Sequence, residues 1–372
     1  MKFHAKTSFF FLFLAFSSRL VIPFMDPKGE MAIDDFPTWL NDVDKKLLLH
    51  STSQDLKRNA NIVVAKDGSG NVKTLKEAIA AAPDNSKTRY VIYVKKGIYD
   101  EVVNIRKTNL TIVGDGKNLT ILTGNLNPKD GAIGTFDTAT LAVDGDGFLA
   151  QDICIRNTAG PTKGQTVALR VSSDRVVIHR CRIEAFQDTL YAHSHRQFYR
   201  GCYITGTIDF ICGDATAVFQ YCQIEPRNPI RSHTNIITAQ KWNDTSESTG
   251  FVFQKCNITA SKDLVPIKKK VKTYLGRPWG RLSRVVFMES FIDDLIEPEG
   301  YKPMTSDVKR LSTLSYREYK NTGPGADTSK RVKWKGFKVI TDPKEAAKFT
   351  VGKFLQGNLW INSTGVPYDN GF

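Results

Sequence analysis

The 372-residue sequence predicts an all-β solenoid of short parallel strands. Apolar or aromatic residues lead through two or three polar residues to an alternating apolar pair in six segments: 148–155, 176–183, 197–204, 217–224, 251–258 and 285–292. Four of these segments close on Cys-x-Ile. The closing residues Ile183, Ile204 and Ile224 are 21 and 20 residues apart. A strand, a crossover helix and a second strand would need roughly 30 residues.

An antiparallel sandwich is the alternative fold. Its hairpins would need a turn about every 8–12 residues, and the observed interval is about twice that. Stacked coils of parallel strands joined by turns match the interval better. Upstream, the β-rich runs 90–94, 110–113 and 119–122 are separated by Gly or Asn turn residues, so we expect them to belong to the same solenoid.

The N-terminal segment has the pattern of a secretory signal peptide. Lys2 and Lys6 precede a short apolar run at 9–16, and the small residues Ser17 and Ser18 follow it. The run is shorter than the ~20 residues that a membrane-spanning helix needs. We therefore expect a secreted protein without a membrane segment. The expected organisation is a leader at 1–25, a short pro-region remnant or linker at 26–60, and one catalytic domain at 61–372.

Composition restricts the class of protein. Charged residues make up 24% and hydrophobic residues 41% of the chain, which is typical of a globular domain and argues against long disorder. The net charge is +14, but the Lys-rich run 268–272 lacks the interleaved aromatic residues of a nucleic-acid platform, so we expect no nucleic-acid partner. Six cysteines and five glycosylation sequons are compatible with an extracellular compartment; the sequons begin at Asn109, Asn118, Asn243, Asn257 and Asn362.

The repeat places two aspartates at one position of successive coils. Asp188 stands five residues after Ile183, and Asp209 stands five residues after Ile204. Stacked strands lie ~4.8 Å apart, so the two carboxylates should lie within roughly 5 Å of each other. Two like charges that close leave one carboxyl protonated and the other ionised, as a general acid and a nucleophile require. The alternative, that each Asp caps a turn, is equally compatible with this register alone.

The surroundings of the pair favour a catalytic role. Asp209 is flanked by apolar residues, which a solvated turn would not need. Gln165 and Gln187 can donate amide hydrogen bonds to an oxyanion. Arg277 can hold a carboxylate through two hydrogen bonds, and Trp279 offers an aromatic face to a sugar ring.

Five motifs occur in order along the chain: GxYxE at 97–101, QTVAL at 165–169, QDTL at 187–190, DFICG at 209–213 and LGRPW at 275–279. Together they resemble the motifs of plant pectin methylesterases, also called pectinesterases, and the resemblance covers about residue 61 to the C-terminus. It implies a right-handed parallel β-helix with short helical or loop segments at its N- and C-terminal ends. This fold agrees with the class that the repeat predicts.

The resemblance also implies a role for each matching residue. Asp209 would be the nucleophile that attacks the methyl-ester carbonyl of a galacturonate unit and forms an acyl-enzyme. Asp188 would donate a proton to the departing methanol and then accept one from water. Gln165 and Gln187 would stabilise the oxyanion, and Arg277 would keep Asp209 ionised and oriented.

Further expectations follow from the same resemblance. Thr135, Gln165, Arg277 and Trp279 would contact the substrate, which is methyl-esterified homogalacturonan, an acidic polysaccharide. A disulfide would join Cys202 and Cys222, with no metal and no cofactor. The protein would act as a monomer in the plant cell wall or apoplast, with a proteinaceous pectinesterase inhibitor as a further partner.

The chain departs from the family pattern at a few positions. Cys212 stands where Phe is usual, Gly164 where His is usual, and Asp214 where Asn is usual. Asp214 adds a negative charge that we expect to perturb the aspartate pair. None of these changes removes a catalytic group. His193 and His195 are expected to be solvated surface residues and not metal ligands.

The N-terminal 60 residues are too short for the inhibitor-like helical domain of many family members, so we expect no such prodomain. Lys45-Lys46 resembles the family's processing site.

Two alternative functions stay open. A catalytically weak or silent pectin-binding wall protein would account for Cys212 and Asp214. A polygalacturonase-like glycoside hydrolase would also use two carboxylates about 5 Å apart. The two glutamines and Arg277 favour ester hydrolysis, because an oxyanion needs hydrogen-bond donors and a glycosyl cation does not.

Overall fold

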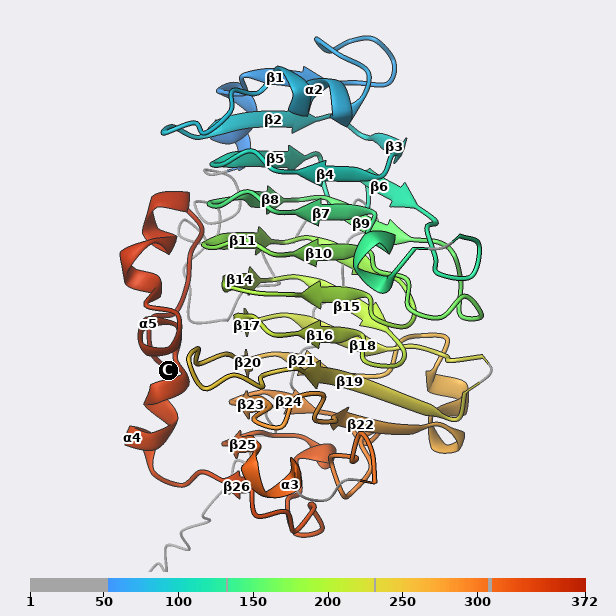
Figure 1. The fold of residues 1–372 in the computed structure, drawn as a ribbon, viewed down its shortest axis with the longest axis vertical. Coiled ribbons are helices and arrows are strands. Elements are labelled where there is room, and N and C mark those ends of the chain that lie inside the picture. Colours follow the sequence, from blue (N-terminus) through green and yellow to red (C-terminus); the bar gives the residue numbers. More distant parts are fainter. Residues whose placement is uncertain (1–52, 132, 231, 307–309) are drawn as a thin grey trace, which may run out of the picture.

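The computed structural model describes residues 53–131, 133–230, 232–306 and 310–372. In these residues the chain winds into a right-handed parallel β-helix with three sheets (Figure 1), which confirms the predicted fold. Neighbouring strands in each sheet are parallel and come from successive coils.

The largest sheet has eleven strands. In order they are β1 (Ile62–Val64), β2 (Tyr90–Val94), β5 (Leu110–Gly114), β8 (Leu149–Gln151), β11 (Val176–His179), β14 (Arg196–Arg200), β17 (Thr216–Gln220), β20 (Gly250–Gln254), β23 (Arg284–Met288), β25 (Ser315–Tyr319) and β26 (Phe337–Val339).

The other two sheets have eight and seven strands. The eight-stranded sheet contains β3 (Gly97–Asp100), β6 (Thr120–Gly124), β9 (Cys154–Asn157), β12 (Arg182–Glu184), β15 (Tyr203–Gly206), β18 (Gln223–Pro226), β21 (Asn257–Ile258) and β24 (Phe291–Ile292). The seven-stranded sheet contains β4 (Val103–Ile105), β7 (Leu141–Val143), β10 (Leu169–Val171), β13 (Leu190–Ala192), β16 (Ile211–Gly213), β19 (Thr234–Gln240) and β22 (Lys272–Gly276).

Helical segments are short and lie at the ends and in the connections. They are residues 53–58, α2 (Leu75–Ala81), η2 (Thr135–Thr138), η3 (Val265–Lys270), α3 (Arg310–Thr313), η4 (Pro324–Ala326), α4 (Pro343–Ala346), η5 (Ala347–Phe349), α5 (Val351–Phe354), η6 (Gly357–Leu359) and η7 (Ile361–Thr364).

Each repeat segment of the sequence is one corner of the coil. Segment 176–183, for example, consists of β11, a bend at Arg180 and β12. The bend residue has a left-handed backbone, with φ of 50° at Arg180, 54° at Tyr221 and 53° at Lys255. One such residue turns the chain from the eleven-stranded to the eight-stranded sheet. The two or three polar residues in the middle of each repeat segment therefore form the turn between the two strands.

Aromatic side chains stack along the interior. The stack consists of Tyr199, Phe219, Phe253 and Phe287, in that order. The centroids of neighbouring rings are 4.5, 4.6 and 4.7 Å apart, and their planes are nearly parallel. These spacings match the ~4.8 Å rise between parallel strands, so each coil adds one ring to the stack. All four rings are fully buried and fill the core of the later coils.

A second internal ladder contains the thiols of the Cys-x-Ile repeats. Cys202 donates to the Ile178 carbonyl at 3.3 Å, and Cys256 donates to the Phe219 carbonyl at 3.3 Å. Ser290 continues the ladder, because its hydroxyl reaches the Phe253 carbonyl at 3.2 Å. The hydroxyl thus replaces the thiol at the same position of the coil.

The disulfide expected between Cys202 and Cys222 is not formed in the structure, where all six cysteines are free and buried. The two residues are stacked one coil apart, as the repeat predicts, but each thiol donates to backbone carbonyls: Cys222 lies 3.6 Å from the Tyr199 oxygen and 3.5 Å from the Gln220 oxygen. The two thiols are also side-chain neighbours, because each affects the pKa of the other.

The C-terminal helices cover the outer face of the eleven-stranded sheet (Figure 1). Val177, Phe198 and Val218 on that face pack with Val351 and Leu355 of the C-terminal segment in one buried cluster. A parallel sheet normally has both faces covered, and these helices provide the second cover.

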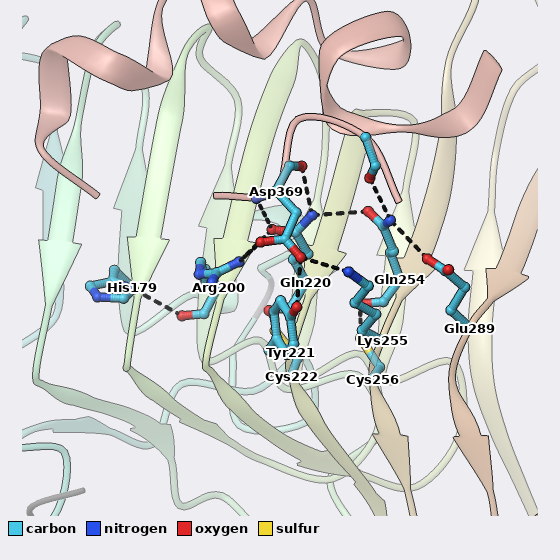
Figure 2. A network of polar contacts seen from close by, with 11 residues as sticks. His179, Arg200, Gln220, Tyr221, Cys222, Gln254, Lys255, Cys256, Glu289 and Asp369 are labelled. Atoms are coloured by element: carbon cyan, nitrogen blue, oxygen red, sulfur yellow. Dashed lines mark hydrogen bonds and ion pairs between the residues drawn. The ribbon is translucent and has the colours of Figure 1, made fainter. Parts of the chain in front are cut away.

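Asp369 fastens the last residues to the same sheet (Figure 2). Its carboxylate accepts hydrogen bonds from Tyr221 at 2.6 Å and Lys255 at 2.8 Å, and lies 3.6 Å from Arg200. Its backbone exchanges two hydrogen bonds with the Gln220 side chain, at 3.0 and 2.9 Å. We call this group of contacts the C-terminal clasp.

The leader expected at 1–25 and most of the region expected at 26–60 lie outside the described residues. The Ser53 hydroxyl donates to Asp152 at 2.5 Å and so attaches helix 53–58 to the solenoid. In the part of the chain that the structure describes, no helix has the length and apolar character that crossing a membrane requires.

Candidate active site

Asp188 and Asp209 lie on adjacent coils, just before β13 and β16. Leu190 pairs with Ile211 in the parallel ladder, so the two aspartates, each two residues earlier, occupy equivalent positions. The Asp188 amide donates to the Ile208 carbonyl at 3.1 Å, which extends the pairing to the aspartates. The charge of Asp209 acts on the Asp188 carboxyl. The structure therefore brings together the two carboxylates that the repeat places in register.

Both aspartates have a left-handed backbone, with φ of 58° at Asp188 and 53° at Asp209. This conformation costs an L residue about 1 kcal/mol or more, and Asp and Asn tolerate it better than other side chains. The bend residues Arg180, Tyr221 and Lys255 have the same conformation, so at the aspartates it belongs to the turns of the coil.

Arg277 holds Asp209 through two parallel hydrogen bonds. Nε donates to Oδ1 at 2.7 Å and Nη2 to Oδ2 at 2.5 Å. Arg277 follows directly after β22, and its own amide donates to the Thr238 carbonyl at 2.9 Å. The preceding Gly276 must be glycine, because a Cβ there would lie 2.1 Å from the Thr238 hydroxyl oxygen. This close approach explains the Gly-Arg order within the LGRPW motif.

The two carboxyls have different affinities for a proton. Burial, and next the charge of Asp209, raise the pKa of Asp188 well above its usual value, although Arg277 acts in the opposite direction. Burial also raises the pKa of Asp209, but its hydrogen bonds and ion pair with Arg277 offset part of this effect. As pH rises, Asp209 therefore loses its proton first, and Asp188 keeps its own.

Gln165 and Gln187 stand side by side on the coils beside the aspartates. They form an isolated parallel bridge, and the amide of Thr166 donates to the Gln187 carbonyl at 3.0 Å. Both residues are partly exposed, and neither side-chain amide has a hydrogen-bond partner among the described residues. Two amide donors therefore remain available beside the carboxylates.

An aromatic surface borders the aspartates on the outer face of the seven-stranded sheet. Tyr191 lies 6.3 Å from Trp279 and 6.3 Å from Phe136, measured between ring centroids. Cys212 and Met304 pack with Tyr191 and Trp279 in a cluster separate from the solenoid core. Thr135, predicted to contact substrate, begins η2 immediately before Phe136.

His193 belongs to this surface, contrary to the expectation of a solvated histidine. Its ring makes edge contacts with Phe136 at 5.2 Å and with Tyr191 at 5.1 Å. Burial, followed by the charges of Arg170 and Lys241, lowers its pKa. Tyr191 lies in β13 and His193 directly follows it, two residues later, so both side chains point to the same face. That alternation was the signal in the sequence that could have placed both beside the aspartates.

The structure describes no metal centre. Among residues 53–131, 133–230, 232–306 and 310–372, no group of three or more His, Cys, Asp or Glu side chains is arranged to hold a metal ion.

Asp214 is placed away from the aspartate pair. Its carboxylate accepts from Thr249 at 2.5 Å and Gln240 at 3.3 Å, and it is not among the charges that shift the pKa of Asp188 or Asp209. The expected perturbation of the pair is therefore not found.

The structure also places Cys212 and Gly164, the other two residues that differ from the family pattern. Cys212 lies beside the aspartate pair. Burial raises the pKa of its thiol, and the charges of Asp188 and Asp209 raise it further. Gly164 has φ of +80°, a conformation that favours glycine over the histidine of the family pattern.

Comparisons with known proteins give a consistent result. Residues 61–358 match the Pectinesterase family model. The chain is 58% identical over 350 residues to Pectinesterase/pectinesterase inhibitor 18 of Arabidopsis thaliana, covering 94% of this chain and 62% of that protein. It is 57% identical over 337 residues to Pectinesterase 2.2 of Solanum lycopersicum, covering 90% of this chain and 60% of that protein. It thus spans about three fifths of the length of these curated relatives.

A solved structure agrees with these relatives. The pectin methylesterase from carrot superposes with a TM-score of 0.82 at 50% sequence identity, and the match covers 84% of this chain and 98% of the carrot chain.

Proposed function

Because this chain belongs to the pectinesterase family, we propose that it hydrolyses the methyl esters of pectin, releasing methanol and leaving galacturonate carboxylates. The observation that carries the proposal is the pair formed by Asp188 and Asp209, with Arg277 bonded twice to Asp209 alone. The pair supplies one ionised and one protonated carboxyl in the same site.

In the first half-reaction Asp209 acts as nucleophile. One of its oxygens bonds to the ester carbonyl carbon, and the carbonyl oxygen becomes an oxyanion. The unpartnered amides of Gln165 and Gln187 can donate to that oxyanion. The C–O bond to the methoxy group then breaks, and Asp188 transfers its proton to the departing oxygen, giving methanol and a mixed anhydride on Asp209.

The second half-reaction returns the site to its starting state. Asp188, now ionised, accepts a proton from water as the water oxygen bonds to the acyl carbon. The bond to Asp209 breaks, and the product carboxyl leaves. Asp188 is protonated again, and Arg277 once more holds an ionised Asp209. No metal or cofactor enters either step.

The aromatic surface supports a sugar polymer as substrate. Trp279, Tyr191 and Phe136 present ring faces and edges beside the aspartates, and apolar ring faces commonly pack on sugar rings. Thr135, Gln165, Arg277 and Trp279 are the residues that we assign to substrate contact. We assign the protein to the cell wall outside the plant cell, where a proteinaceous inhibitor is a candidate partner.

A product analysis tests this proposal against the alternatives. Purified protein is incubated with highly methylated pectin, and methanol, reducing ends and unsaturated products are measured. Methanol without new reducing ends is the expected result. New reducing ends would identify a glycoside hydrolase instead, and the absence of every product would identify a pectin-binding protein.

A further inference from the structure

Basic side chains in the central coils include well-paired arginines, whereas the C-terminal end carries an excess of basic over acidic residues. Arg170 bonds Asp144 at 2.7 Å, and Arg180 bonds Asp152 at 2.6 Å. By contrast, residues 317–353 contain ten Lys and Arg against four Asp and Glu, a net charge of +6 out of +14 for the whole chain. The positive field of the protein therefore originates to a large extent at one end of the solenoid.

The unpaired charges gather around the last strand. We define the C-terminal lysine surface as Lys330, Lys333, Lys335, Lys338, Lys344 and Lys348, all of which are exposed. They belong to the connection before β26, to β26, to α4 and to η5, which lie together at the C-terminal end of the solenoid (Figure 1). An ion pair between Lys338 and Glu345, at 2.5 Å, joins β26 to α4.

Most of these ammonium groups lack an anionic partner. In the part of the chain that the structure describes, the side chains of Lys330, Lys335, Lys344 and Lys348 form no hydrogen bond or ion pair. Exposed ammonium groups without anionic partners concentrate counterions at the surface. A linear polyanion would replace those counterions, and flexible lysine stems can follow its shape.

The position of this surface relates it to the aspartate pair. β22 is the last strand of the seven-stranded sheet, and Arg277 and Trp279 follow it directly. Lys302, further along the chain, has its ammonium 6.0 Å from the centre of the Tyr274 ring of β22. Lys302 is thus an exposed cation beside the last strand of this sheet.

We propose that the C-terminal lysine surface is a second binding site for galacturonan, selective for stretches whose carboxylates are already free. This inference rests on the proposed function, because ester hydrolysis is the step that creates those carboxylates. Carboxylates that the enzyme has freed in one stretch of a polymer then bind the lysine surface and keep the enzyme on that polymer. Methylated stretches carry no charge at these positions and bind only at the aspartate pair.

Lysines on an edge strand have another common role. β26 ends the eleven-stranded sheet, and charged side chains on such a strand prevent it from pairing with another chain. In that case the lysines would affect self-association and leave polysaccharide binding unchanged.

The test compares two variants with the same change of net charge. One carries K330Q, K335Q, K344Q and K348Q. The matched control carries K73Q, K76Q, K87Q and K96Q, four exposed lysines at the N-terminal end whose side chains likewise form no bond among the described residues. Binding to polygalacturonate is measured at low and moderate salt, and methanol release is measured on a short, fully methylated oligogalacturonide.

The C-terminal variant should bind polygalacturonate about tenfold more weakly at low salt, with a reduced salt dependence, while the control changes less than about twofold. Equal losses in both variants, or no loss in either, would overturn the proposal. So would self-association of the C-terminal variant with unchanged binding. The two assays keep the esterase function and the second binding site apart. If wild type releases no methanol from the short ester, the proposed function fails. Binding to polygalacturonate is measured without turnover and tests the second site alone.

Discussion

Asp209 and Asp369 each lie beside an arginine, yet their pKa values shift in opposite directions. Asp369 has Tyr221, Lys255 and Arg200 around it, and although burial raises its pKa, these partners lower it overall. Asp209 has only Arg277 to offset burial, and its pKa is raised. Three donors therefore stabilise the Asp369 carboxylate, whereas Arg277 alone only partly offsets the burial of Asp209. The clasp contributes to the fold, and the pair is the site that we propose to be catalytic.

The largest effect should come from Asp209→Asn. An amide cannot act as the nucleophile, so methanol release from methylated pectin should fall by about a thousandfold or more. Binding to pectin should stay close to the wild-type level, because the aromatic surface is unchanged. A variant that retains a tenth of wild-type turnover would contradict the assignment of the nucleophile.

The pair with Arg277 should be the next most sensitive feature. Arg277→Lys keeps a positive charge but loses the two parallel hydrogen bonds, so methanol release should fall by about a hundredfold. Since Arg277 lowers the pKa of Asp209, its replacement should raise that pKa, and the acid limb of the pH profile should move to higher pH. As a matched control, Arg180→Lys alters the ion pair between Arg180 and Asp152 at the bend between β11 and β12. It should leave the pH profile of methanol release unchanged. An unmoved acid limb in Arg277→Lys would contradict this role.

The clasp should affect stability and not turnover. Asp369→Asn should lower the free energy of unfolding by about 2 kcal/mol near neutral pH, with kcat unchanged. The pKa of Asp369 is depressed in the folded state, so this stabilisation is present above its unfolded pKa, near 3.8, and is lost as pH falls through the lower folded value. Denaturant unfolding at several pH values would show the difference between wild type and variant shrinking in acid. A difference that stays constant from neutral to strongly acidic pH would rule out the ionic origin.

The smallest effect is expected at Asp214. Because its charge does not shift the pKa of either catalytic candidate, Asp214→Asn should change kcat by less than about twofold and leave both limbs of the pH profile in place. Its hydrogen bonds from Thr249 and Gln240 both reach one oxygen, which the amide retains. Displacement of the acid limb in this variant would show long-range coupling that the structure does not indicate.

The features predictable from the sequence are those that repeat. Cys-x-Ile at 20- and 21-residue intervals indicates parallel coils, and the same count places Asp188 and Asp209 in register, because every coil has the same length there. Contacts between distant segments carry no such signal. Asp369 reaches Tyr221 across 148 residues. His193 was missed because its partner Phe136 comes from a connection outside the repeat.

The central claim is that Asp188 holds a proton at a pH where Asp209 is ionised. Infrared difference spectroscopy at neutral pH tests it directly, by comparing wild type with Asp188→Asn and with Asp209→Asn. The carbonyl stretch of a protonated carboxyl should be present in wild type, absent from Asp188→Asn and retained in Asp209→Asn. A wild-type spectrum without that band, or a band lost only in Asp209→Asn, would contradict the claim.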